Sequence, residues 1–223
     1  MLVVEELALL LVDAGSGAPV TTAATTGPLL AAGVLRELEL AGRVRVEPAR
    51  ARGGSRVALL DPAPAGSAVL DRALAAVAER APCPASRLLT PLGPLARGLA
   101  QRVLADLVAA GALAEERSRL LGVLPVVRHR VLEPAVLDAV RARMAAALTR
   151  PPGPDARAAA LVALLAAAGA LVRVHDPGAL GTTRRELLAA GRAAIAADPV
   201  AAALADVVRG AGATAGSGSG GGG

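Results

Sequence analysis

Arginine is the residue with the clearest chemical potential in this chain, because all 24 of its lysine or arginine positions are arginines. Four of them flank one apolar segment, with Arg117 and Arg119 before it and Arg128 and Arg130 after it. A guanidinium group binds phosphate or carboxylate oxygens through paired N–H donors. The spacing therefore predicts a surface that binds anionic groups around a hydrophobic tip. The apolar residues of that tip are Leu120, Leu121, Val123, Leu124, Val126 and Val127.

Two interpretations of this segment stay open. In one, the arginines hold anionic lipid headgroups while the apolar tip enters the acyl region of a membrane. Each arginine near an anionic surface contributes about 1 kcal/mol, and each buried large aliphatic side chain contributes roughly 1.5 to 3 kcal/mol. These contributions would support reversible attachment. In the other, the tip packs into the core or against another subunit, and residues 117–130 form a homo-oligomer contact.

The overall charge also favours anionic partners. The net charge is +5 and the sequence pI is about 11.2, which suits lipid headgroups, phosphates or nucleic acid. A second group of arginines lies earlier in the chain, where a solvated hairpin surface explains it as well as a binding role does. This group comprises Arg43, Arg45, Arg50, Arg52 and Arg56.

The residues that most enzyme mechanisms need are missing. Without lysine there is neither a phosphate-loop lysine nor a Schiff-base lysine. His129 and His175 stand apart, and the single Cys83 can form neither an internal disulfide nor a thiolate metal site. His175 is expected to end a buried helix, where its imidazole meets free backbone carbonyls. We therefore expect a non-enzymatic protein without a metal or other cofactor.

The hydrophobic periodicity predicts a mainly α-helical, multi-helix fold with two β-hairpins; the single domain and the projection of one hairpin are implied by the family resemblance described below. The first hairpin pairs residues 43–47 with 56–61, and the second lies on either side of the apolar tip. The expected helices cover 2–12, 27–41, a stretch beginning after Ser67, 94–110, 134–148, 155–174, 179–197 and 199–209.

One helix should form the centre of the domain. The longest apolar run, Ala158 to Val172, is shorter than the roughly 20 residues that a membrane span needs. It is therefore expected to be buried by its own protein, with Asp155 as its N-cap. The domain should cover residues 1–209, and residues 210–223 should form a flexible Gly/Ser-rich tail. We expect a cytoplasmic protein, peripheral on the cytoplasmic face of a membrane.

Several stretches, in their order along the chain, resemble the Golgi phosphoprotein 3 family in its short bacterial form. They span about residues 3 to 208. The resemblance implies a mostly α-helical domain around a buried central helix, with a projecting hairpin. It also implies peripheral binding to phosphatidylinositol 4-phosphate and, in eukaryotes, an adaptor role that retains glycosyltransferases; the protein cargo is unknown. The stretches are EELALLLVDAGSG, LLAAGVLRELELAGRVRVE, DPAPAGSAVLDRALAAV, LADLVAAGALAEE, RLLGVLPVVRHRVLEP and DARAAALVALLAAAGALV.

The lipid site of the resembled family carries over only in part. Thr22 stands at the position of a site tryptophan and Ala31 at that of a site arginine. Arg97 and Ala100 stand at the positions of two site arginines one helical turn apart. Arg97 and the nearby Arg102 are therefore the candidate headgroup ligands. Because a phosphate is usually held by several donors at once, these losses favour general anionic-lipid binding over phosphoinositide specificity.

Two other functions remain as alternatives. Each helix–glycine–hairpin unit could belong to a winged helix that binds nucleic acid. Carboxylates on the preceding helices would repel a phosphate backbone, so nucleic acid is the less favoured partner. These carboxylates belong to Glu37, Glu39 and Asp106. The third possibility is a soluble oligomeric scaffold, in which the second hairpin is buried between subunits.

Overall fold

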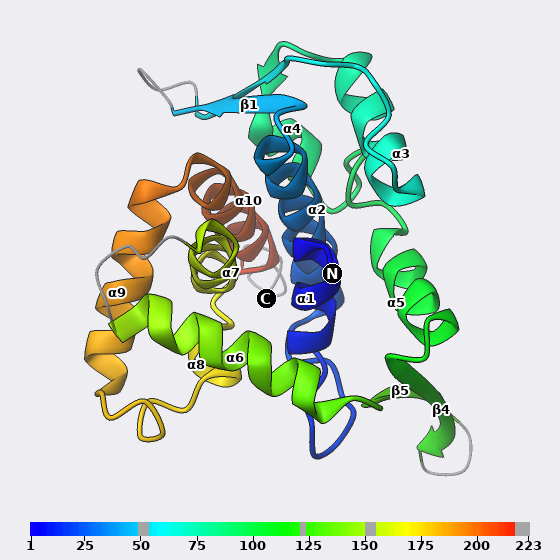
Figure 1. Cartoon of the computed structure of the whole chain (residues 1–223), viewed down its shortest axis with the longest axis vertical. Coiled ribbons are helices and arrows are strands. Elements are labelled where there is room, and N and C mark those ends of the chain that lie inside the picture. The colour runs from blue at the N-terminus through cyan, green and yellow to red at the C-terminus, as the bar shows by residue number, and fades with distance from the viewer. Residues whose placement is uncertain (49–53, 121–123, 150–154, 217–223) are drawn as a thin grey trace, which may run out of the picture.

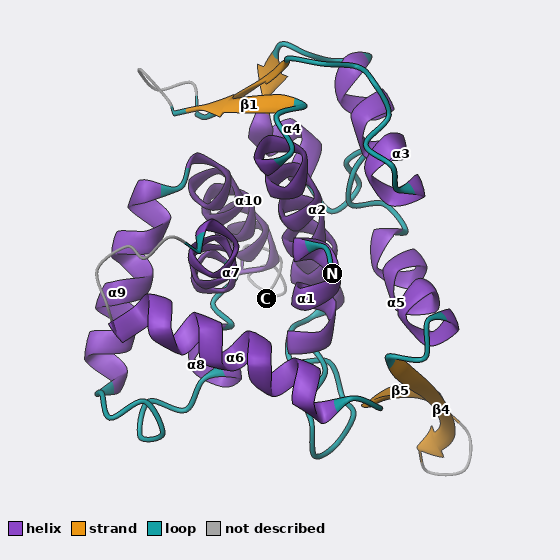
Figure 2. Ribbon diagram, viewed as in Figure 1, coloured by secondary structure: helices purple, strands orange, loops and turns teal. Residues whose placement is uncertain are grey.

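The computed structural model describes residues 1–48, 54–120, 124–149 and 155–216, with only the backbone at 118–120, 124–126 and 213–216. Most of it is helical (Figure 2), which confirms the predicted fold class. The helices are α1 (Val3–Leu10), α2 (Ala23–Leu40), α3 (Ala68–Ala78), α4 (Ala85–Leu89), α5 (Leu99–Ala109), α6 (Pro134–Thr149), α7 (Ala156–Ala167), α8 (Leu171–Val174), α9 (Arg184–Ala197) and α10 (Pro199–Gly216). The strands are β1 (Val44–Glu47), β2 (Arg56–Leu59), β3 (Cys83–Pro84), β4 (Leu113–Leu120) and β5 (Leu124–Val131).

The buried helix at the centre of the fold is α7, as predicted. It packs against α2, α6, α9 and α10 (Figure 1), and Leu161 and Leu164 are completely buried. Asp155 caps it, its Oδ1 accepting a hydrogen bond from the Ala158 N–H at 2.9 Å. The expected continuous helix to residue 174 is wrong, because Gly169 has a φ of +68° and ends α7 in a left-handed turn.

Among the described residues, no single helix combines the length and apolar character needed to cross a membrane. The helices α9 and α10 together meet that requirement by length and composition, but they are bent by 112° relative to each other.

The two sheets lie at opposite ends of the molecule (Figure 1). The first hairpin is confirmed, with Val44 opposite Leu59 and Glu47 opposite Arg56. It is part of a three-stranded sheet, however, because β3 pairs with β2. Sequence periodicity could not reveal β3, which is only two residues long. The second hairpin, β4–β5, is confirmed and projects beyond α5 (Figure 1).

Two helix ends differ from the sequence expectation. The helix α5 begins at Leu99 instead of residue 94, because Gly98 adopts a φ of +64° and the preceding residues form turns. The helix α10 continues to Gly216, so residues 210–216, expected to be part of the flexible tail, are helical. Residues 217–223 lie outside the described part of the chain.

A buried ion pair joins three helices near the centre. The Glu37 carboxylate on α2 receives two hydrogen bonds from the Arg157 guanidinium on α7, at 2.6 and 3.0 Å. It also accepts the Val3 N–H at the start of α1, at 2.8 Å. The Glu37 side chain is only 6% exposed. Glu6 of α1 forms a similar pair with Arg143 of α6. Because buried charges are tolerated only when paired and hydrogen-bonded, these contacts determine how α1, α2, α6 and α7 assemble.

His175 ends α8 and is buried, as expected, but the predicted contact with free carbonyls is absent. Its Nε2 has no hydrogen-bond partner within the described residues. Burial, and secondly the positive charge of Arg141, hold the pKa of the imidazole below its ordinary value of 6.5.

The folded protein should therefore lose stability as the pH falls below about 6.5, because His175 then takes up a proton in the unfolded state before it does so in the folded state. His175→Gln should flatten this part of the stability profile. Urea unfolding of both proteins at several pH values between about 5 and 7.5 measures the effect. Parallel profiles for the variant and the wild type would contradict the assignment to His175.

Candidate functional site

The described arginines of the β4–β5 hairpin lie on two different faces. Residues directly opposite each other in an antiparallel pair share a face, and neighbours along a strand alternate. Arg117 lies opposite Val127, whereas Arg128 lies opposite Glu116 and Arg130 opposite Ala114. Arg117 therefore points away from the other two. The hairpin thus presents described arginines on both of its faces.

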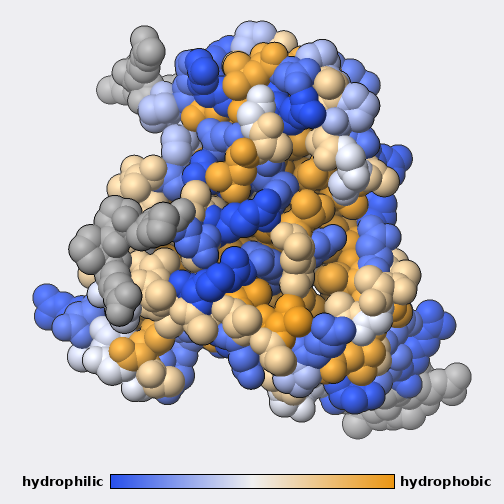
Figure 3. All heavy atoms as spheres, viewed as in Figure 1, coloured by the Kyte–Doolittle hydropathy of each residue, from blue (hydrophilic) through white to orange (hydrophobic). Residues whose placement is uncertain are grey.

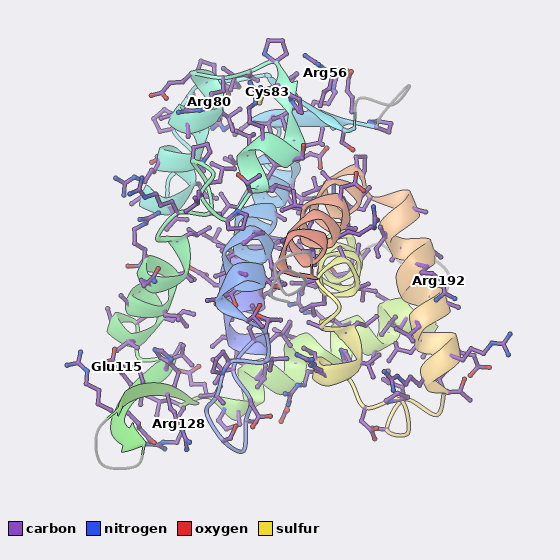
Figure 4. The ribbon with its side chains drawn as sticks, turned by 180° about the vertical axis from the view of Figure 1, so that it is seen from behind. Arg56, Arg80, Cys83, Glu115, Arg128 and Arg192 are labelled. Atoms are coloured by element: carbon purple, nitrogen blue, oxygen red, sulfur yellow. The ribbon has the colours of Figure 1, made fainter. Side chains whose placement is uncertain are left out.

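Two of these arginines are already paired. The Nε of Arg117 donates to Glu115 at 2.6 Å, and the Nε of Arg130 donates to Glu116 at 2.9 Å. Arg128 is exposed and forms no ion pair within the described residues; Figure 4 labels it and Glu115 on the hairpin. Exposed pairs of this kind are weak and exchange readily with other anions. Four arginines and two glutamates still leave β4–β5 with a net charge of +2.

Part of the predicted hairpin site cannot be placed. Leu121 and Val123 lie outside the described residues, and Arg119, Leu120, Leu124 and Val126 are described by their backbone alone. Val127, the remaining tip residue, is 46% exposed. On the face seen in Figure 3, the described surface at the hairpin corner is mostly hydrophilic.

The root of the hairpin is held firmly against the N-terminal region. The His129 N–H donates to the Gly17 carbonyl oxygen at 3.0 Å. Gly17 has a φ of +65°, and a Cβ there would lie 2.8 Å from the His129 carbonyl oxygen. Only glycine fits this approach without displacing backbone. The orientation of the hairpin is thus determined by the loop between α1 and α2.

A second exposed feature lies in the loop between α4 and α5, residues 90–98. Leu92 is 87% exposed at the third position of a turn that the Gly93 N–H closes on the Thr90 carbonyl, at 2.7 Å. Pro91 precedes it at the position where proline favours a turn. A Cβ on Gly93 would lie 2.7 Å from the Leu88 carbonyl oxygen. The turn is therefore tightly built, and it presents a large apolar side chain to solvent.

Cationic side chains lie in and next to the 90–98 loop. Arg97, also exposed, follows the turn in the same loop, and its backbone N–H donates to the Gly93 carbonyl at 3.1 Å. The Arg102 guanidinium donates to the Arg97 carbonyl at 3.0 Å. Arg72 of α3 and Arg102 of α5 line a pocket of about 270 Å³ whose floor includes Leu95 and Leu99. Within the described residues, none of these three arginines is in an ion pair.

The first turn of α2 connects the two features. A Cβ on Gly27 would lie 3.5 Å from the Ala96 carbonyl oxygen of the 90–98 loop. The neighbouring Thr26 lines a small cavity together with Val127 and His129 of β5 and Leu104 of α5. The loop and the hairpin root thus both lie near the N-terminal turns of α2.

The positions carried over from the resembled family have different environments. Thr22 is exposed at the N-cap of α2, and Ala100 is half-buried on α5. Ala31 is completely buried in the core, so no headgroup ligand can stand there. Arg56 of the earlier arginine group lies beside Cys83 and Arg80 at the far end of the molecule from Arg128 (Figure 4). That group cannot act together with the hairpin.

Comparison with known families shows to which family the chain belongs. The model of the Golgi phosphoprotein 3 (GPP34) family matches residues 3–211. The chain belongs to the Golgi phosphoprotein 3 family. This membership confirms the resemblance and is consistent with a lipid-binding role. The family is known for non-enzymatic lipid-binding or adaptor proteins. No curated protein matches the chain.

For this Golgi phosphoprotein 3 member, the sequence analysis named Arg97 and Arg102 as candidate ligands and did not name Leu92 or Arg72, which the structure adds as candidates. Leu92 lies in TPLGP, where flanking proline and glycine predict a turn and hence an exposed leucine. That signal was available in the sequence. No sequence signal pointed to Arg72, because its place in the same pocket as Arg102 depends on how α3 packs near α5.

Proposed function

We propose that this protein is a non-enzymatic peripheral membrane protein that binds anionic lipid headgroups through the surface around the 90–98 loop. The observation that carries the proposal is Leu92, an 87% exposed leucine on a tight turn, in a loop that also contains the exposed Arg97 and accepts a hydrogen bond from Arg102. Insertion of Leu92 into the acyl boundary supplies roughly 1.5 to 3 kcal/mol. Each nearby arginine adds about 1 kcal/mol at an anionic surface.

The β4–β5 hairpin forms the second part of the proposed surface. Arg128 is free to bind headgroups, and Arg117 and Arg130 can exchange their exposed glutamate partners for lipid phosphates. In this proposal the apolar side chains of the hairpin also enter the membrane. The same hairpin serves as the proposed contact between copies of the chain.

Recognition in this proposal rests on charge rather than on one lipid. Because Ala31 is buried and Ala100 carries no donor, the surface lacks the set of convergent donors that would single out phosphatidylinositol 4-phosphate. We expect the protein to bind phosphatidylglycerol vesicles as tightly as phosphatidylinositol 4-phosphate vesicles of equal negative charge. An adaptor role toward other proteins would use surfaces that stay accessible on the membrane.

Vesicle flotation tests the proposal. Leu92→Glu should weaken binding to phosphatidylglycerol vesicles at least about tenfold, because a charge replaces the inserted side chain. Leu60→Glu is the matched control: Leu60 is 48% exposed directly after β2, outside both the 90–98 loop and the β4–β5 hairpin. It makes the same change in charge and should leave binding unchanged.

Two further sets of variants test the 90–98 loop and the β4–β5 hairpin separately. Arg97→Ala should weaken binding about fivefold, whereas Arg192→Ala on α9 should not. Leu121→Glu/Leu124→Glu tests the hairpin tip, with native mass spectrometry reporting whether the same variant also loses self-association. If the wild type never floats with anionic vesicles, or if Leu60→Glu and Leu92→Glu behave alike, the proposed membrane surface is wrong.

A further inference from the structure

Most of the net charge of the chain comes from one part of the sequence. Residues 43–87 contain eight arginines and four carboxylates, a net charge of +4 in a chain whose total is +5. Three of these arginines, which we call the β3 arginines, lie near the short strand β3. They are Arg56 on β2, Arg80 after α3 and Arg87 on α4. The proposed membrane surface makes no use of them.

The β3 arginines lie around Cys83, a buried residue of β3. Figure 4 labels Arg56 and Arg80 on either side of it. Burial raises the pKa of the Cys83 thiol, and the charges of Arg87, Arg56 and Arg80 oppose that rise. The three guanidinium groups are therefore close enough to act on one atom. An anionic group bound at β3 would be attracted by all three charges.

The β3 arginines keep donors available for a partner. The NH2 of Arg56 donates to the Pro82 carbonyl at 3.3 Å, which uses one of its five N–H groups. Arg80 pairs with Glu79, whose side chain is 68% exposed, and such a pair exchanges readily. Arg87 is exposed and forms no ion pair within the described residues. Because the Arg56 side chain is already anchored, less of its freedom is lost on binding.

The surroundings of β3 narrow the class of partner. This strand is the outer one of its sheet, and Pro82 and Pro84 carry no N–H, so a partner cannot extend the sheet through them. Recognition must depend on side chains. Glu47 lies opposite Arg56 on the exposed face of the sheet, so the continuous phosphates of a duplex would also meet a carboxylate. The chain has no aromatic side chain on which unpaired bases could stack. These features favour the separated carboxylates of a peptide.

We propose that the β3 arginines bind an acidic segment of a partner protein, whose aspartate or glutamate carboxylates accept hydrogen bonds from the guanidinium groups. Arg56 lies at the far end of the molecule from Arg128 of the β4–β5 hairpin (Figure 4). A partner at β3 therefore does not compete with lipids for the hairpin, which suits an adaptor. This orientation rests on the proposed function, whereas the binding of an acidic segment requires no lipid.

Fluorescence anisotropy with a fluorescein-labelled peptide of alternating glutamate and serine tests the site without lipid. The wild type should bind this peptide and should not bind the same peptide with glutamine in place of glutamate. Arg56→Gln/Arg87→Gln should weaken binding at least about fivefold. The matched control, Arg185→Gln/Arg192→Gln, removes the same charge from exposed positions of α9 and should bind within about twofold of the wild type.

Further measurements distinguish the other partners. Arg56→Gln/Arg87→Gln should float with phosphatidylglycerol vesicles as the wild type does, and a selective loss of flotation would assign these arginines to the membrane surface and overturn the proposal. Tighter binding of duplex DNA than of the glutamate peptide at the same salt would also overturn it. So would equal losses in the two double variants, or a wild type that does not bind the peptide at about 0.01 M ionic strength, where charges are least screened. Leu92→Glu should bind the peptide like the wild type, so failure of the vesicle experiments would leave this proposal standing.

Discussion

Arg157→Ala is expected to lower the free energy of unfolding by about 3 to 5 kcal/mol, because it leaves the Glu37 carboxylate buried without its cation. Glu37 is 6% exposed on its side chain and receives both hydrogen bonds of the Arg157 guanidinium. It would keep only the Val3 N–H as a donor. Urea unfolding followed by circular dichroism measures the loss.

Two comparisons show whether burial of the charge is the cause. Arg209→Ala removes an arginine that is 74% exposed and paired with Asp206, and it should cost at most about 1 kcal/mol. Glu37→Leu/Arg157→Leu replaces both charges together and should lose less than Arg157→Ala alone. Equal losses for Arg157→Ala and Arg209→Ala would show that the buried pair does not stabilise the junction of α1, α2 and α7.

Leu161→Ala should destabilise the protein by about 2 to 5 kcal/mol, the usual cost of truncating a buried leucine. Leu161 is completely buried on α7, which packs against helices on several sides, so the surrounding structure can relax only partly. The chain has no aromatic residue whose large side chain could fill the space. Thermal or urea unfolding of the variant gives the value.

The same truncation at Leu188 is the control for this prediction. Leu188 is 41% exposed on α9, and Leu188→Ala should cost about 1 kcal/mol or less. If the two leucine variants lost similar stability, α7 would not be the central packing element of the domain.

The helices were largely predictable because their signals are local. The apolar run around Leu161 indicated a buried helix and Asp155 its N-cap. Gly42 and Gly111, which follow α2 and α5, have positive φ values of 69° and 77° and end these helices. These features depend on neighbours within one helical turn, which is the range over which a sequence pattern can be interpreted.

The errors arose where distant segments meet. The strand β3 exists only because β2 offers it a partner, so no periodicity announced it. In the sequence, the hairpin arginines flank the apolar tip in two pairs, and no pattern indicates which face each side chain takes. The register that places Arg117 opposite Val127 puts Arg117 on the other face from Arg128. A shift of one residue would have reversed that arrangement, and sequence alone does not specify it.

By itself, the sequence determined a mainly α-helical member of the Golgi phosphoprotein 3 family, with a buried central helix, a β4–β5 hairpin and an excess of arginine. Composition, periodicity and the order of segments carry that information. Only the tertiary structure decided that Arg72 and Arg102 share a pocket beside the Leu92 loop. It also decided that Ala31 is buried and that alanines of α6, α7 and α9 line an open groove. The physical reason is that exposure and proximity depend on how helices pack against one another, and that packing joins residues far apart in the chain.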